Sequence, residues 1–127
     1  MRLHSDTNTA DYQIQSYTEN TIDINGSTYD HSLLLTPVQL ITDWPVNSIA
    51  ALTPETCSPI IAAQPEIILL GLGKHFVMPP ASQLAPLYAA GFSVDVMTTA
   101  AACRAFTLLS CDNRNVLAAL ILPASTS

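Results

Sequence analysis

The chain has 127 residues, of which 49% are hydrophobic and 11% are charged. This length is typical of one domain, and the apolar fraction is too high for an intrinsically disordered protein. Ten acidic residues against four basic ones give a net charge of −6. Nucleic-acid-binding proteins neutralise phosphates with clustered Lys and Arg, so we expect no nucleic-acid partner.

The charge is uneven along the chain. Residues 1–70 carry one basic and eight acidic side chains, whereas residues 71–127 carry three basic and two acidic ones. Any attraction for an anion must therefore come from the C-terminal half. The longest apolar runs have seven residues, well short of the roughly 20 that a membrane span needs, so we expect no transmembrane segment. The first twenty residues show no targeting pattern, which favours a cytoplasmic location.

The first third of the chain predicts an antiparallel β unit. We expect residues 1–11 to be a flexible lead. Tyr12, Ile14 and Ser16 alternate with polar neighbours, which is the period of a strand with one solvated face. Asn25-Gly26 predicts a type I′ hairpin turn, because both positions tolerate positive φ. We expect the strand that resumes at Ser27 to continue to Leu35.

The remainder alternates between helices and strands. The sequence predicts helices that begin at Thr53, Ser82 and Ala100, and strands over residues 67–70, 92–97 and 115–122. The strands at residues 67–70 and 115–122 are apolar on both faces, and helices of about ten residues separate the three strands, which indicates a largely parallel sheet with right-handed crossovers. We therefore predict one α/β domain over residues 12–123, followed by a tail at residues 124–127.

Two segments that follow predicted strands are candidates for a site, because ligands of open parallel sheets bind beyond the carboxyl ends of the strands. The first is the glycine-rich exit that ends in Lys74 and His75. It lacks the GxxxxGK[ST] spacing of a phosphate-binding loop. Its glycines, Gly71 and Gly73, either let the backbone turn tightly or shape an anion pocket.

The second segment begins a helix at Thr98 and Thr99. The first turn carries only small side chains, so an anion could approach the free amides, and Arg104 is placed to lean over the same turn. The alternative is that Thr99 only caps the helix and that Arg104 pairs with an acid such as Asp95. The full candidate anion site comprises Gly71, Gly73, Lys74, His75, Thr98, Thr99 and Arg104.

No catalytic set can be identified. A helix dipole could lower the pKa of the Cys103 thiol, but no signature links it to His75 as a base. Buried free thiols are the expected state of the three cysteines, Cys57 and Cys111 included. The other histidines lack ligand spacing, so we expect neither a metal site nor a cofactor.

Three blocks of the sequence, residues 65–74, 91–104 and 114–120, resemble a family of small single-domain proteins of unknown function. Its animal members include mitochondrial complex I assembly factor 3 and the adipogenesis-associated domain-containing protein. The resemblance covers about residues 22–122. It implies a three-layer α/β fold, with a central mixed sheet beside an antiparallel β unit. For a bacterial cytoplasmic member it implies no established reaction, cofactor or substrate.

Two positions depart from the pattern of that family. Leu72 replaces a small polar residue, and Thr107 stands where Asn is common, so the predicted pocket is more apolar than in its relatives. Our leading hypothesis is a non-enzymatic module that binds another protein or assembles a complex, and a homodimer is compatible with it. The alternative is a protein that binds a small anionic molecule, or an enzyme, with its site at Lys74, Thr98, Thr99 and Arg104.

Overall fold

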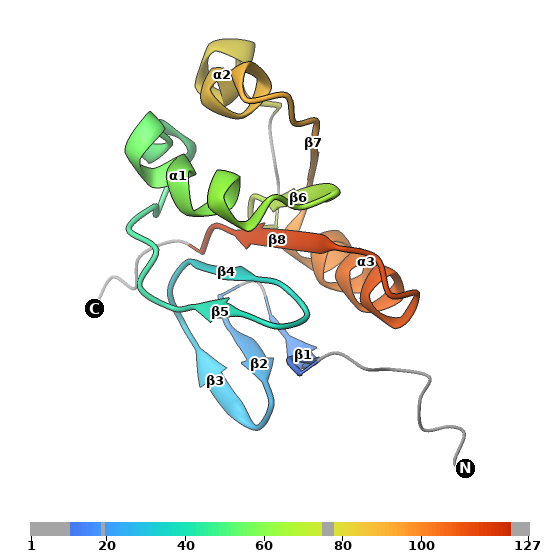
Figure 1. Ribbon diagram of the computed structural model, residues 1–127. Helices are drawn as coiled ribbons and strands as arrows, with labels where there is room; N and C mark the ends of the chain where they lie inside the picture. The colour runs from blue at the N-terminus through green and yellow to red at the C-terminus, as the bar shows by residue number, and fades with distance from the viewer. Residues whose placement is uncertain (1–10, 19, 75–77, 123–127) are drawn as a thin grey trace.

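The computed structural model describes residues 11–18, 20–74 and 78–122 (Figure 1). The expected flexible lead, apart from Asp11, and the expected tail at residues 124–127 lie outside this part of the chain.

The described residues form two sheets. A three-stranded antiparallel sheet has the order β1-β2-β3, and a five-stranded mixed sheet has the order β5-β4-β8-β6-β7. The strands of the first sheet are β1 (Ile14–Tyr17), β2 (Ile22–Ile24) and β3 (Ser27–Tyr29). The strands of the second are β4 (Leu33–Leu35), β5 (Leu40–Ile41), β6 (Ile67–Gly71), β7 (Val94–Met97) and β8 (Val116–Leu120). β6, β7 and β8 are parallel, whereas β4 and β5 are antiparallel to their neighbours.

The helices complete three layers around the five-stranded sheet. They are η2 (Ile49–Ala51), α1 (Pro54–Ala63), α2 (Ala81–Ala89) and α3 (Thr99–Cys111). One core cluster joins α1 and α2 to one face of the sheet, and the other joins α3 and the three-stranded sheet to the opposite face (Figure 1). The predicted α/β fold with a central mixed sheet and an antiparallel unit is confirmed.

Local sequence signals account for several of the boundaries. Asn25 and Gly26 have φ values of 52° and 89°, as the predicted hairpin turn requires. Thr53 caps α1 by accepting a hydrogen bond from the amide of Thr56, whose own hydroxyl accepts one from the Thr53 amide. Thr98 caps α3 in the same way, by accepting from the amide of Ala101.

The expected single strand from Ser27 to Leu35 is wrong. The strand is interrupted at residues 30–32, so that β3 belongs to the three-stranded sheet and β4 belongs to the central, five-stranded sheet. The physical reason is a change of environment: β3 has a solvated face, whereas the three leucines of β4 are buried on both sides. The hydroxyl of Ser32 accepts from the amide of Leu122 at 2.8 Å and anchors the chain where it enters the central sheet.

Gly71, at the end of β6, marks a very close approach of α3 to the sheet. A Cβ atom there would lie 3.0 Å from Leu120 Cδ2, 3.1 Å from Ala102 Cβ and 3.2 Å from Thr99 Cα. Such distances are shorter than ordinary packing contacts, so any larger residue would push α3 away from β6. Gly73, by contrast, has a φ of 89° and serves the turn that follows.

Gly71→Ala is therefore expected to lower the free energy of unfolding by about 1–3 kcal/mol, because the added methyl group overpacks the contact with α3. Urea unfolding measures the loss as a lower midpoint at an unchanged slope. Adding Ala102→Gly removes one of the groups that the new methyl meets. The double variant should thus lose less than the sum of the single losses. If Gly71→Ala is as stable as the wild type, the contact between α3 and β6 has space for a methyl group, and the prediction is wrong.

Glu66 and Arg114 connect the segments that lead into β6 and β8. Arg114 donates through Nε and Nη2 to Glu66 Oε2 at 3.2 and 3.0 Å, and the amide of Asn115 donates to Glu66 Oε1 at 3.2 Å. The hydrogen bonds from Arg114, and then that from Asn115, hold the pKa of the Glu66 carboxyl below its ordinary value.

The coupling between Glu66 and Arg114 should therefore depend on pH. Because folding lowers the pKa of Glu66, its contribution to stability is present above the unfolded value of about 4.3 and is lost as the pH falls through the folded value. A double-mutant cycle with Glu66→Gln and Arg114→Gln, read by urea unfolding, should give a stabilising coupling at neutral pH that disappears at strongly acidic pH. A coupling that is unchanged over this range would contradict the assignment.

Candidate functional site

The two sequence segments singled out above lie side by side. Gly71 and Met97 are paired in the parallel register of β6 and β7, so the chain leaves both strands at the same edge of the sheet. The exit from β6 leads to α2 on one face, and the exit from β7 leads to α3 on the other (Figure 1). This divergence is the arrangement that opens a ligand crevice in many α/β proteins.

Here the two exits are joined by the hydrogen bonds of the chain itself. The amide of Leu72 donates to the carbonyl of Met97 at 3.0 Å, and the amide of Thr99 donates to the carbonyl of Gly73 at 2.9 Å. In return, the amide of Gly73 donates to the Thr99 hydroxyl at 2.8 Å. The crevice between the exits is thus closed by two backbone hydrogen bonds and one hydrogen bond to the Thr99 hydroxyl.

Backbone amides at the start of α3 also donate hydrogen bonds within the chain. Besides the amide of Thr99, that of Ala101 donates to the Thr98 hydroxyl at 3.2 Å, and that of Ala102 donates to the Thr98 carbonyl at 2.9 Å. The expectation of several free amides in the first turn of α3 therefore has to be corrected. The Gly73 carbonyl and the Thr98 hydroxyl accept from two of the amides that an anion would use, those of Thr99 and Ala101.

Beside this closed crevice lies a hollow of about 190 Å³, where part of the predicted site comes together. It is lined by Tyr17, Thr18, Gly73, Lys74, Thr98, Thr99 and Ala100. Gly71 is buried beneath α3 rather than in the lining. His75 lies outside the described residues.

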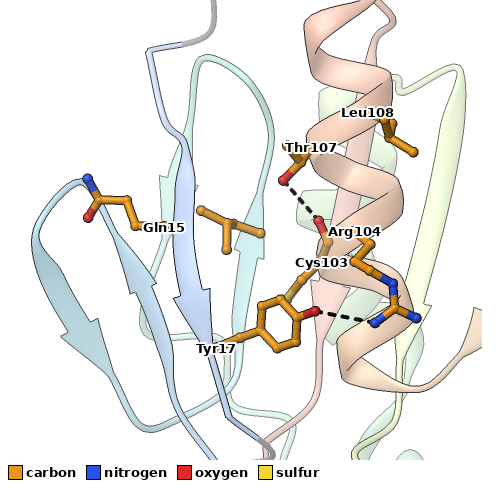
Figure 2. A pocket seen from close by; sticks show the side chains of 7 residues that line it. Gln15, Tyr17, Cys103, Arg104, Thr107 and Leu108 are labelled. Carbon is orange, nitrogen blue, oxygen red and sulfur yellow. Dashed lines mark hydrogen bonds between the residues drawn. The ribbon is translucent and has the colours of Figure 1, made fainter.

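Arg104 lines a different hollow, of about 340 Å³, between β1 and α3. We name it the β1–α3 groove, and Figure 2 shows it from close by. Its lining residues are Ile14, Gln15, Tyr17, Cys103, Arg104, Thr107 and Leu108. Arg104 Nη1 donates to the Tyr17 hydroxyl at 3.3 Å, so the guanidinium points to β1. It neither covers the first turn of α3, as expected, nor pairs with Asp95, which is exposed on β7.

Tyr17 borders both hollows and was missed in the sequence analysis. Alternation predicted that Ser16 shares a face with Ile14, but a β-bulge between these residues shifts the register. As a result Ser16 is exposed, and Tyr17 packs against the core beside Ile14. The aromatic residue at the strand end was the available signal, but alternation alone cannot reveal a bulge.

Cys103 is poorly suited to act as a nucleophile. Its side chain is buried, and burial raises the pKa of the thiol to about 12, against a smaller lowering by the charge of Arg104. The net pKa of Cys103 is thus raised, not lowered as a position at the start of a helix could have made it. Burial also raises the pKa of Cys57, whereas Cys111, which we expected to be buried, is exposed at the end of α3.

Within the described ranges, no helix combines the length and the apolar character needed to cross a membrane.

Two proteins of known sequence are similar to this chain. The chain is 32% identical over 108 residues to the "13 kDa major membrane protein" of Francisella tularensis subsp. holarctica, covering 84% of this chain and 88% of that protein. It is also 32% identical over 116 residues to a Danio rerio protein named NADH dehydrogenase (ubiquinone) 1 alpha subcomplex assembly factor 3. That match covers 90% of this chain and 66% of the fish protein.

Two solved structures of similar sequence share this fold. An NMR structure of a Xanthomonas campestris protein matches with a TM-score of 0.82 at 28% identity, covering 100% of this chain and 96% of that one. A Mth938-like domain of Bordetella pertussis matches with a TM-score of 0.74 at 27% identity, covering 100% and 95%. The family described as "Protein of unknown function (DUF498/DUF598)" matches residues 14–121. The resemblance seen in three sequence blocks is thus confirmed, and the chain belongs to the DUF498/DUF598 family.

Proposed function

We propose that this protein is a non-catalytic module that binds another protein during the assembly of a complex. The observation that carries this proposal is the closed crevice at the ends of β6 and β7. A parallel sheet of this topology offers its ligand site there, yet two hydrogen bonds occupy it: the Thr99 amide donates to the Gly73 carbonyl, and the Gly73 amide donates to the Thr99 hydroxyl. The features that remain for recognition lie on the outer surface.

The chemistry of the described residues supports the same proposal. Cys103 lies beside Arg104, an arrangement that favours a thiolate, but burial outweighs the charge and keeps the thiol protonated at neutral pH. Large apolar side chains are exposed instead: Leu108 on α3 is 72% exposed and Val38, after β4, is 71% exposed. Exposed apolar side chains provide surface that a protein partner can cover.

The name of one relative supports the same proposal. The Danio rerio relative is named as an assembly factor, and the present chain covers about two thirds of its length. We propose that a binding role is what this chain shares with that relative. We place this role in the bacterial cytoplasm.

The proposal predicts that the protein, purified under mild conditions from the cells that produce it, carries a second polypeptide in a fixed ratio. Native mass spectrometry measures this ratio, and fractionation of the same cells should place the complex in the cytoplasm. An unrelated acidic protein of similar size, tagged in the same way, is the control. If the protein forms a homodimer, the second polypeptide is another copy of the same chain. A strictly monomeric chain that co-purifies with nothing would contradict the proposal.

The second candidate is an anion-binding protein, and one observation favours it. The hollow of about 190 Å³ brings Gly73, Lys74, Thr98 and Thr99 together, with a cationic side chain beside the start of a helix. This arrangement suits a phosphate or a carboxylate. Of the predicted site residues, Arg104 is the one that the structure places in the other hollow.

Binding of an anion in this hollow predicts a higher melting temperature in inorganic phosphate or in succinate. A ligand at about 100 times its dissociation constant stabilises by about 2.7 kcal/mol, which is easily measured as a thermal shift. Lys74→Gln should abolish the shift, whereas Arg104→Gln, in the neighbouring hollow, should leave it intact. An equal shift in the two variants, or none in the wild type, would rule out this site.

A further inference from the structure

We infer that the β1–α3 groove binds a peptide segment of a partner protein in which a carboxylate stands next to an apolar side chain. This inference rests on the proposed binding function and names the surface and the chemistry through which it acts.

The polar side chains of the groove, other than Arg104 and Tyr17, are turned away from it or occupied. Gln15 points to the far side of β1, where its Oε1 accepts from the amide of Gly26 at 2.7 Å (Figure 2). The Thr107 hydroxyl donates to the carbonyl of Cys103 at 3.1 Å within the helix. The surface left for a ligand is therefore mostly apolar.

The groove has the size of a recognition site for one or two side chains. Its volume of about 340 Å³ is at the lower end of the roughly 300–1,000 Å³ of ligand pockets. Ile14 and Tyr17 form one wall from β1, and Leu108 stands on α3 with 72% of its surface exposed. A leucine so exposed next to a hollow extends the apolar surface beyond the hollow itself.

One cation lies in this groove. The Arg104 guanidinium has five N–H donors, and among the described residues its hydrogen-bond partner is the Tyr17 hydroxyl. It forms no ion pair within that part of the chain, although the protein as a whole carries a net charge of −6. A planar guanidinium held from one side by a tyrosine is well matched to a carboxylate, which accepts two parallel hydrogen bonds.

Charge and shape together favour a polypeptide as the occupant. An anionic membrane or a nucleic acid is attracted by clusters of basic residues, whereas this groove has one arginine in an acidic protein. A small molecule confined to the hollow would leave Leu108 largely uncovered. A peptide that crosses the groove covers Leu108 with one residue and reaches Arg104 with an acidic one.

A library of random heptapeptides displayed on phage, selected against the whole protein, tests this inference. We expect the selected sequences to be enriched in Asp or Glu next to Leu, Ile, Phe or Met. A synthetic peptide from this set should bind at least tenfold more weakly to Arg104→Gln, because a charge-assisted pair is lost. Replacement of its acidic residue by the amide should weaken binding to the wild type by a similar factor.

Arg114→Gln is the matched control, since it removes the same side chain near the opposite end of α3 and should leave the affinity unchanged. Leu108→Ser should also weaken binding, and its effect on stability should be small because the side chain is exposed. The amide NMR spectrum of each variant verifies that the fold is intact, and shifts induced by the peptide should be confined to residues 14–17 and 103–108.

Three results would overturn the groove assignment: no enrichment, selected peptides without acidic residues, or equal affinity for Arg104→Gln. Sedimentation of the protein with phosphatidylglycerol vesicles in an Arg104-dependent manner would replace the peptide by a lipid surface. The proposed function is tested separately by the co-purified partner. A partner retained equally by wild type and by Arg104→Gln would leave the binding role intact and place it on another surface.

Discussion

The close contact between α3 and the end of β6 at Gly71 is the packing constraint on which the arrangement of the strand exits depends. Only a residue without a side chain lets Thr99 and Ala102 lie directly on the strand. This approach brings the exits of β6 and β7 within hydrogen-bonding distance, so that Gly73 and Thr99 pair and the usual crevice of a parallel sheet is closed. The hollow of about 190 Å³ beside this contact is the space that stays open at the ends of these strands.

The same contact fixes how α3 is rotated about its axis. Because Ala102, Cys103 and Phe106 are buried against the sheet, helical periodicity turns Arg104 and Leu108 to the surface. The three-stranded sheet packs on the same face of the central sheet as α3 does, and the groove lies where its edge strand meets the helix. An apolar surface with one arginine is thus a consequence of packing two elements side by side on one sheet.

Membership of the DUF498/DUF598 family assigns the fold of this chain. Fold and function are separable, and a shared scaffold carries different activities through the residues that it presents. The named relatives illustrate this point, since one is called a membrane protein and another an assembly factor. In this chain Thr107 lines the β1–α3 groove, whereas Leu72 packs against the core cluster that α1 and α2 share with the sheet.

The sequence by itself determined the elements whose signals are local. The Asn25-Gly26 turn, the threonine caps of α1 and α3, and the apolar strands of the parallel sheet each depend on residues within a few positions of one another. Only the tertiary structure decided that the chain changes sheets before Leu33, that a bulge brings Tyr17 to the core face, and that Arg104 points to β1. These features depend on how separate elements pack, and hydrophobic periodicity says which side of an element is buried but not which neighbour it meets.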